Sequence, residues 1–178
     1  MNRLRFPLGL PPGCAIWIAG IGFAGAALAL TIVAPPAPRL VWNASASAPP
    51  GLWWVRPRAR LWRGAMVIAR TPDAWRKLAA ARRYLPANVP LVKRVAGISG
   101  DRICARGAEI SINGAAVAKR LRHDAAGRLL PWWEGCRTLR RSEVFLLMAE
   151  VPGAFDGRYF GPTDRADVIG RARLLWAR

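Results

Sequence analysis

The segment from Ala15 to Ala34 is the feature that most constrains how this chain can fold. Its twenty residues, AIWIAGIGFAGAALALTIVA, contain no charged side chain, and Thr31 is the only polar one. At about 1.5 Å per residue, a helix of this length spans ~30 Å, the hydrocarbon thickness of a bilayer. A buried core helix is the alternative, but nothing is charged between Arg5 and Arg39 and the segment has no amphipathic stripe. The segment therefore predicts a transmembrane helix.

The charges around this segment predict its orientation. Arg3 and Arg5 precede it, so the positive-inside rule places residues 1–14 in the cytoplasm and residues 39–178 outside. A cleaved signal peptide is the alternative, but Pro35 directly after Ala34 fits the small-residue cleavage pattern poorly. We therefore expect a single uncleaved anchor over residues 15–34 in the inner (cytoplasmic) membrane, with the following domain on the periplasmic side.

The charge balance of the chain points to an anionic partner without naming it. The 178 residues include 28 Lys and Arg against 10 Asp and Glu, a formal net charge of +18. Such a balance suits lipid headgroups or nucleic acid, or simply reflects a proteome rich in arginine, and it excludes neither an enzyme nor a scaffold. Because the basic domain is expected outside the cytoplasm, we expect the lipid bilayer as a partner and no nucleic acid.

The cysteines agree with an exported domain. Cys104 and Cys136 lie in the part expected outside the cytoplasm, where two cysteines more often pair than stay as free buried thiols. We therefore expect a disulfide between them, with two free thiols as the alternative. The chain has no C-x-x-C spacing, and His123 is its only histidine, so we expect neither a zinc site nor any other metal or cofactor.

Residues 39–178 consist mainly of short apolar runs separated by turns, which predicts a mainly β domain. Asn113-Gly114 between two such runs is typical of a two-residue hairpin turn. A single helix is expected over Pro72–Leu85, where apolar residues recur at a spacing of three to four and Pro86 follows. The expected strands are Leu52–Val55, Met66–Ala69, Leu91–Val95, Ile110–Ile112, Val144–Met148 and Val168–Leu175.

A Ser-His-Asp triad is poorly supported. It would require His123, which lies in the polar, turn-like stretch RLRHDAAGR, and the chain contains no G-x-S-x-G motif. We expect this histidine to be exposed or locally hydrogen-bonded. The ten acidic residues are scattered, several beside arginines, which gives little support for a pair of catalytic carboxylates.

A serine–lysine pair fits the sequence better. Lys93 lies among apolar residues in PLVKRVAGI, and a lysine acts as a general base when apolar surroundings lower its pKa. Taken alone, Lys93 could equally be a surface lysine at a strand edge. Ser45 and Ser47 lie in the small-residue loop NASASAPPGLW, which either exposes a hydroxyl to substrate or is a flexible linker.

Four blocks of the sequence together resemble the type I signal peptidase family, and in particular its conjugative-transfer (TraF-type) branch. In family order they are NASASAPPGLW, RYLPANVPLVKRVAGISGDRIC, DAAGRLLPWWEGC, and FDGRYFGP followed by IGRARLLW. The resemblance extends from Asn43 to the C-terminus and includes the N-terminal anchor. It implies a signal-peptidase-like antiparallel β catalytic domain with a small helical insertion, preceded by one transmembrane helix.

The resemblance also implies roles for five residues. Ser47 matches the family nucleophile and Lys93 its general base. Ser45 matches the hydroxyl that lines the oxyanion hole beside the backbone N–H of the nucleophile. Asp156 and Arg158 match an Asp-x-Arg pair that supports the lysine or holds the local fold.

The fourth block departs from the branch, which usually reads SFDSRYFG. Ala154 and Gly157 replace its two serines. If the first of those serines normally orients the lysine, then Asp156 or a water would have to hold Lys93 here.

The resemblance implies a membrane-anchored serine endopeptidase that removes leader peptides from exported precursors. In this branch the substrate is a pilin precursor in conjugative transfer, and some relatives join the cleaved ends into a ring. The alternative is a non-enzymatic basic component of a secretion or conjugation apparatus.

Overall fold

The structure, a computed structural model, describes residues 12–178. The chain divides into two compact units, Met1–Ala37 and Pro38–Arg178. In the first unit, helix α1 (Pro12–Val33) is long and apolar enough to cross a membrane, with a mean hydropathy of 2.2 over Cys14–Val33 and none of those residues buried. An apolar helix is therefore present where the sequence predicts an anchor. Arg3 and Arg5, which carry the orientation prediction, lie outside the described residues.

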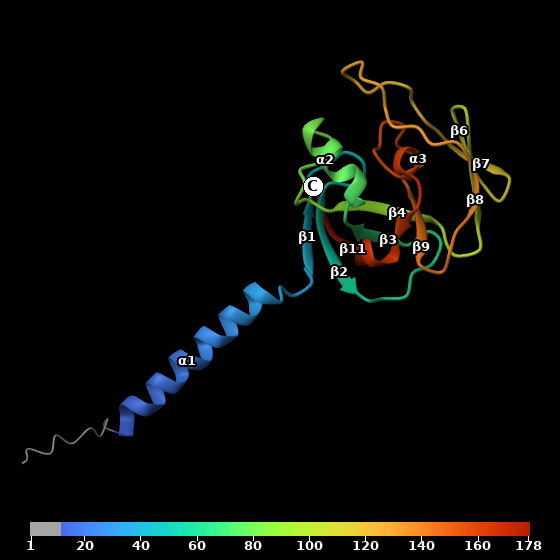
Figure 1. Cartoon of the computed structure of the whole chain (residues 1–178). Coiled ribbons are helices and arrows are strands. Elements are labelled where there is room, and N and C mark those ends of the chain that lie inside the picture. The colour runs from blue at the N-terminus through green and yellow to red at the C-terminus, as the bar shows by residue number, and fades with distance from the viewer. Residues whose placement is uncertain (1–11) are drawn as a thin grey trace, which may run out of the picture. The chain divides into compact units, whose positions relative to one another are not determined.

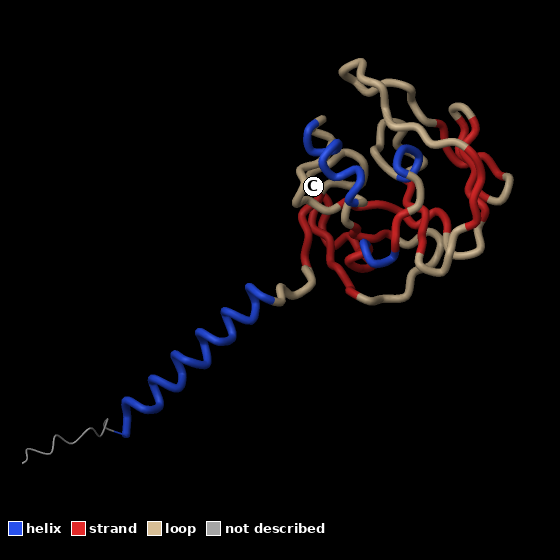
Figure 2. The backbone as a smooth tube through the Cα atoms, viewed as in Figure 1, coloured by secondary structure: helices blue, strands red, loops and turns tan. Residues whose placement is uncertain are grey.

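A seven-stranded antiparallel sheet forms the larger part of the second unit (Figures 1 and 2). Its strand order is β1-β2-β11-β3-β4-β9-β10, so β4 lies inside the sheet between β3 and β9. Besides pairings of strands close in sequence, it contains the long-range β4–β9 pair and the return of the C-terminal strand between β2 and β3. The strands are β1 (Leu40–Asn43), β2 (Gly51–Pro57), β3 (Met66–Ala69), β4 (Leu91–Gly97), β9 (Glu143–Leu147), β10 (Thr163–Asp164) and β11 (Val168–Ala177).

A second, four-stranded sheet has the order β7-β6-β5-β8. It consists of β5 (Arg102–Arg106), β6 (Glu109–Ile112), β7 (Ala115–Lys119) and β8 (Gly135–Thr138). Asn113 and Gly114 join β6 to β7 with φ values of 53° and 86°, which confirms the predicted hairpin turn. Cys104 and Cys136 lie opposite each other in β5 and β8 and form a disulfide, as expected.

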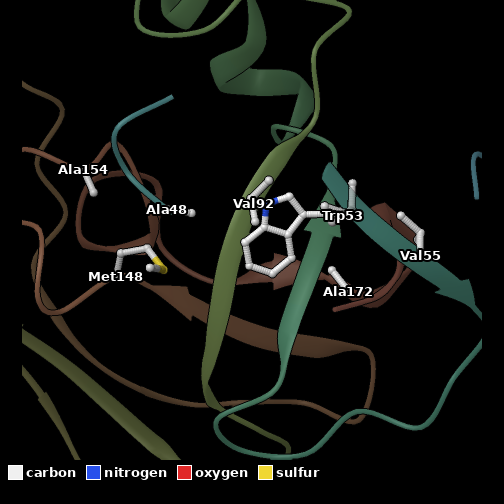
Figure 3. Close-up of a cluster of buried hydrophobic side chains, with 8 residues drawn as sticks. Ala48, Trp53, Val55, Val92, Met148, Ala154 and Ala172 are labelled. Carbon is white, nitrogen blue, oxygen red and sulfur yellow. The ribbon is translucent and has the colours of Figure 1, made fainter. Parts of the chain in front are cut away.

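Apolar side chains from both sheets form the core. Side chains of β5 and β6 pack with Phe145 and Leu147 of β9, so the smaller sheet packs on the larger one. Another cluster surrounds Trp53 of β2 and includes Val92 of β4 (Figure 3). Ala48 belongs to the same cluster, so the loop after β1 is anchored in the core next to the seven-stranded sheet.

The helical content of this unit is small. Helix α2 (Asp73–Ala81) ends four residues before the predicted boundary at Leu85. The predicted end was wrong because Arg83 adopts a left-handed conformation with φ 59°, and the Tyr84 N–H donates back to the carbonyl of Ala79. Two short helices follow near the C-terminus, α3 (Gly157–Phe160) and the 3₁₀ helix η1 (Arg165–Asp167). The prediction of a mainly β domain with a small helical insertion is confirmed.

Candidate active site

Ser47 and Lys93 are 46 positions apart in the chain, yet their side chains are in contact. Lys93 lies on β4, and Ser47 lies in the serine loop, residues 44–50, between β1 and β2. The Lys93 Nζ donates a hydrogen bond to Ser47 Oγ over 2.7 Å. Lys93 is only 1% exposed, and its strand lies inside the seven-stranded sheet. The interpretation of Lys93 as a surface lysine is therefore wrong.

Burial changes the acid–base behaviour of this lysine. Loss of hydration lowers the pKa of Lys93 from its ordinary 10.5 to about 8. The Asp156 carboxylate acts in the opposite direction, and the nearby Arg158 guanidinium adds to the lowering. A buried amine with this pKa is partly neutral near pH 8, and a neutral amine can accept a proton from a hydroxyl.

Ser45 lies beside Ser47, with 3.1 Å between the two Oγ atoms. The hydroxyl of Ser45 also donates to Asn43 Oδ1 over 2.9 Å. Within residues 12–178, the backbone N–H of Ser47 makes no hydrogen bond, so it remains available as a donor. The Ser47 N–H can therefore serve an oxyanion hole as it stands, whereas the Ser45 hydroxyl would first have to rotate away from Asn43 Oδ1.

Asp156 and Arg158 form a buried ion pair, with Arg158 Nε 2.8 Å from Asp156 Oδ1. Asp156 also accepts from the backbone N–H of Met148, and Arg158 donates to the carbonyls of Met148 and Pro152. None of these hydrogen bonds involves Lys93. The contacts of the pair therefore hold the turn that follows β9, and Asp156 acts on Lys93 only through its charge.

The serine and the lysine line a cleft of about 480 Å³. Away from these two residues its wall is largely apolar and aromatic, with Tyr84, Leu121 and Phe155 among the lining side chains. Such a concave, mostly apolar site with a few polar groups at one end is typical of a substrate-binding cleft. His123 lines the same cleft and is exposed, in agreement with the prediction of an exposed histidine.

One wall of the cleft is a loop between β7 and β8, residues 120–134, which we name the strap (Figure 1). Toward α2, the Tyr84 hydroxyl donates to Asp124 over 2.6 Å, and this hydrogen bond holds the pKa of the Asp124 carboxyl below its usual range. At the base of the strap, Arg120 is buried and its guanidinium lies 2.7 Å from Glu134. The strap is therefore tied to the segment after α2, and its own first and last residues are tied to each other.

Sequence reasoning missed Asn43 as a site residue. It ends strand β1 immediately before the serine loop, is only 6% exposed, and makes hydrogen bonds through both atoms of its amide. The available signal was an asparagine between a strand and a loop of small residues, since asparagine side chains often bond nearby backbone groups. Within residues 12–178, no group of three or more His, Cys, Asp or Glu side chains suits a metal ion.

Comparisons with known proteins find three similar chains of known description. A plasmid transfer protein TraF of Escherichia coli is 33% identical over 146 residues, which is 75% of this chain and 82% of the relative. A second Escherichia coli TraF is 31% identical over 170 residues, 89% of this chain and 95% of the relative. A probable conjugal transfer protein TraF of Sinorhizobium fredii is 32% identical over 146 residues, 74% of this chain and 73% of that protein.

A solved signal peptidase I from Enterococcus faecalis aligns with 64% of this chain and 97% of its own, at 18% identity and a TM-score of 0.38. The family described as signal peptidase, peptidase S26, matches residues 14–177. That match extends over almost the whole chain, from the apolar helix through the serine loop and the buried lysine to the last strand. The chain belongs to the signal peptidase family, peptidase S26.

Proposed function

We propose that this chain is a membrane-anchored serine endopeptidase that removes leader peptides from exported proteins. In this proposal Ser47 is the nucleophile and Lys93 is its general base. One observation carries it: the buried Lys93 Nζ lies 2.7 Å from Ser47 Oγ at the edge of a cleft. A nucleophile and a base within hydrogen-bond reach are what covalent catalysis requires.

The proposed reaction begins with neutral Lys93. Its amine takes the proton of Ser47, and Oγ attacks the carbonyl carbon of the scissile peptide bond. The Ser47 N–H and, after rotation, the Ser45 hydroxyl stabilise the negative oxygen of the tetrahedral intermediate. Lys93 then gives its proton to the leaving amine, which leaves an acyl-enzyme on Ser47. A second nucleophile, deprotonated by Lys93, releases the product.

The substrate we propose is a leader-bearing pilin precursor in conjugative transfer. The support is the likeness to proteins named for plasmid and conjugal transfer, together with the signal peptidase family. When a leader is removed, the acyl-enzyme carries the leader and water resolves it. When a C-terminal segment is removed, the acyl-enzyme carries the mature chain, and either water or that chain's own N-terminal amine resolves it. Mass measurement of the product separates the two, because a cyclised product is one water lighter than the hydrolysed one.

The bilayer is the second proposed partner. Besides α1, one exposed sheet face combines Trp54 of β2 with its cross-strand neighbours Leu40 and Arg173. Trp42 and Trp176 lie on the same part of the sheet, with their rings 5.8 Å apart. Tryptophan and arginine suit the interface of an anionic membrane, and residues 38–72 contain no acid that would repel it. We propose that this face lies against the periplasmic side of the inner membrane.

A non-enzymatic envelope component would gain nothing from Lys93. Keeping an amine buried costs free energy of folding, and replacing buried ionic groups with apolar ones is often stabilising. A peptidase gains a base with a lowered pKa from the same burial.

The test is cleavage of a leader-bearing precursor by the full chain in membranes. Ser47→Ala and Lys93→Ala are each expected to abolish cleavage, and the double variant to be scarcely worse, since the two act as a unit. Lys93→Arg fails as well, because a guanidinium stays protonated. The matched controls are Ser99→Ala and Lys77→Ala, whose side chains are exposed and lie outside the cleft. Cleavage that survives Ser47→Ala or Lys93→Ala would contradict the proposal.

A further inference from the structure

Among the described residues 12–178, Asn43 is the one buried side chain that binds the serine loop at several points. Its Nδ2 donates to the carbonyls of Ser45, Ala48 and Pro49, at 3.1, 3.0 and 3.1 Å. Its Oδ1 accepts from the backbone N–H and from the hydroxyl of Ser45, at 3.1 and 2.9 Å. Because three carbonyls lie on one side of the amide and two donors on the other, its nitrogen must face the carbonyls and its oxygen the donors.

These contacts make Asn43 a brace across the base of the loop. The carbonyls it binds lie on both sides of Ser47, so the two limbs of the loop are tied to one rigid amide. That amide is itself fixed, because Asn43 pairs with Gly51 in the β1–β2 ladder. On the far side, Ala48 packs in the core and the Trp53 indole N–H donates to the Pro49 carbonyl. Ser47 therefore lies at the tip of a loop whose base is held from two directions.

The Asn43 amide also determines the direction in which the Ser45 hydroxyl donates its hydrogen bond. Because an amide oxygen only accepts, the single hydroxyl proton of Ser45 is directed to Asn43 Oδ1. Toward Ser47, the Ser45 Oγ then presents lone pairs. A continuous chain of contacts results, from Asn43 Oδ1 through Ser45 Oγ and Ser47 Oγ to Lys93 Nζ, with steps of 2.9, 3.1 and 2.7 Å.

From this geometry, and resting on the proposed function, we infer that Asn43 is a positioning residue for the nucleophile. It holds Ser47 Oγ within hydrogen-bond distance of Lys93 Nζ and holds the Ser45 side chain beside Ser47. It does so from outside the cleft, since Asn43 is not among the residues that line it. An effect on turnover, with substrate binding unchanged, is therefore the expected signature. A displacement of about 1 Å at a reacting atom can lower a rate ~10²-fold.

The test measures kcat and KM of precursor cleavage by the full chain. Asn43→Ala is expected to lower kcat about 10²-fold and to change KM less than about threefold. Asn43→Asp keeps the shape and the acceptor for Ser45 but loses both N–H donors, so kcat is expected to fall about tenfold or more. This second variant keeps the test decisive if Asn43→Ala folds poorly. Asn88→Ala, at an exposed asparagine outside the cleft, is the matched control and stays at the wild-type rate.

A double-mutant cycle separates positioning from a merely structural role. Ser45→Ala alone is expected to lower kcat by ~10²–10³-fold if its hydroxyl serves the oxyanion. Because Asn43 acts partly through Ser45, the combined loss should fall short of the product of the single losses by about fivefold or more.

Three results would overturn the inference: an unchanged kcat in Asn43→Ala and Asn43→Asp, a loss confined to KM, or fully multiplicative losses in the double variant. Ser47→Ala is measured in the same series. If it retains cleavage, the proposed nucleophile is wrong and the role of Asn43 falls with it. If Ser47→Ala is inactive while Asn43→Ala and Asn43→Asp keep the wild-type kcat, only the inference about Asn43 fails.

Discussion

At the scale of single residues, the environment of Lys93 sets the pH range in which the proposed dyad can work. Its amine is 1% exposed, and its hydrogen-bond partner within residues 12–178 is the Ser47 hydroxyl. Desolvation is therefore the main influence on its acid–base behaviour, with Asp156 and Arg158 acting in opposite directions.

Cleavage is expected to be slow at low pH and to become faster as the pH rises, because the base must be a neutral amine. Burial lowers the pKa of Lys93 to about 8, so below that pH the amine is protonated and cannot accept the Ser47 proton. We expect kcat/KM to fall about tenfold per pH unit below ~8 and to level off above it. Lys77→Ala should show the same profile. A profile that is flat between about pH 6 and 9 would speak against Lys93 as the base.

The lowered pKa of Lys93 also has a consequence for stability. The folded-state pKa, about 8, lies below the ordinary 10.5, so between these values the unfolded chain binds more protons and stability rises with pH. Below pH 8 the lysine is protonated in both the folded and the unfolded chain, so burial of its ammonium lowers the free energy of unfolding by the full amount. At pH 7, Lys93→Met should therefore have a free energy of unfolding up to ~3 kcal/mol higher than wild type, and should unfold at a higher temperature. Thermal denaturation monitored by circular dichroism measures this, and a less stable Lys93→Met would refute it.

At the scale of elements, strands rich in branched apolar residues were predictable and the contacts between distant elements were not. β3 has the predicted bounds, and β2, β4, β6, β9 and β11 differ by a few residues at their ends. β5 and β8 were missed because they are short and carry arginine, cysteine or glycine in place of an apolar run. The four-residue β1 and the two-residue β10 were missed as well. The end of α2 was missed because nothing in the sequence marks Arg83 as left-handed.

In the candidate site, too, single residues could be predicted from the sequence and the contacts between distant residues could not. The resemblance identified Ser47 and Lys93, but spacing alone could not bring them together. Their contact requires β4 to be an inner strand and the loop after β1 to be fastened next to it. The brace at Asn43 and the strap are also long-range or loop arrangements that no periodicity in the sequence reports.

The strap gives a prediction at this scale. The hydrogen bond from Tyr84 to Asp124 is one of its few side-chain ties to the segment after α2. Tyr84→Phe removes only that hydroxyl, so amide hydrogen exchange should rise in residues 121–131 and stay unchanged in β4. Unaltered exchange in the strap would mean that the other contacts suffice to hold it. Arg63→Ala, which breaks an ion pair with Asp101 on another face, is the control.

At the scale of the whole molecule, an apolar helix precedes a disulfide-containing β domain, which fits an anchored, exported enzyme. The three cysteines test this expectation together. Maleimide labelling of the denatured, unreduced protein should modify Cys14, which is free, and leave Cys104 and Cys136 unmodified until reductant is added. Labelling of all three without reductant would show that the domain does not reach an oxidising compartment.

Orientation is tested separately. A periplasmic reporter fused after Arg178 is expected to be active, and N-terminal sequencing of the mature protein should begin before residue 15. A mature chain that starts after Ala34 would contradict the uncleaved anchor.

Covalent labelling shows whether Ser47 is a nucleophile that Lys93 activates. The full chain is treated with a fluorophosphonate, and the modified residue is located by peptide mass mapping. One adduct on Ser47 is expected, formed faster as pH rises through about 8, absent in Ser47→Ala and strongly slowed in Lys93→Ala. An adduct on another residue, or labelling of Ser47 at an undiminished rate in Lys93→Ala, would contradict this expectation.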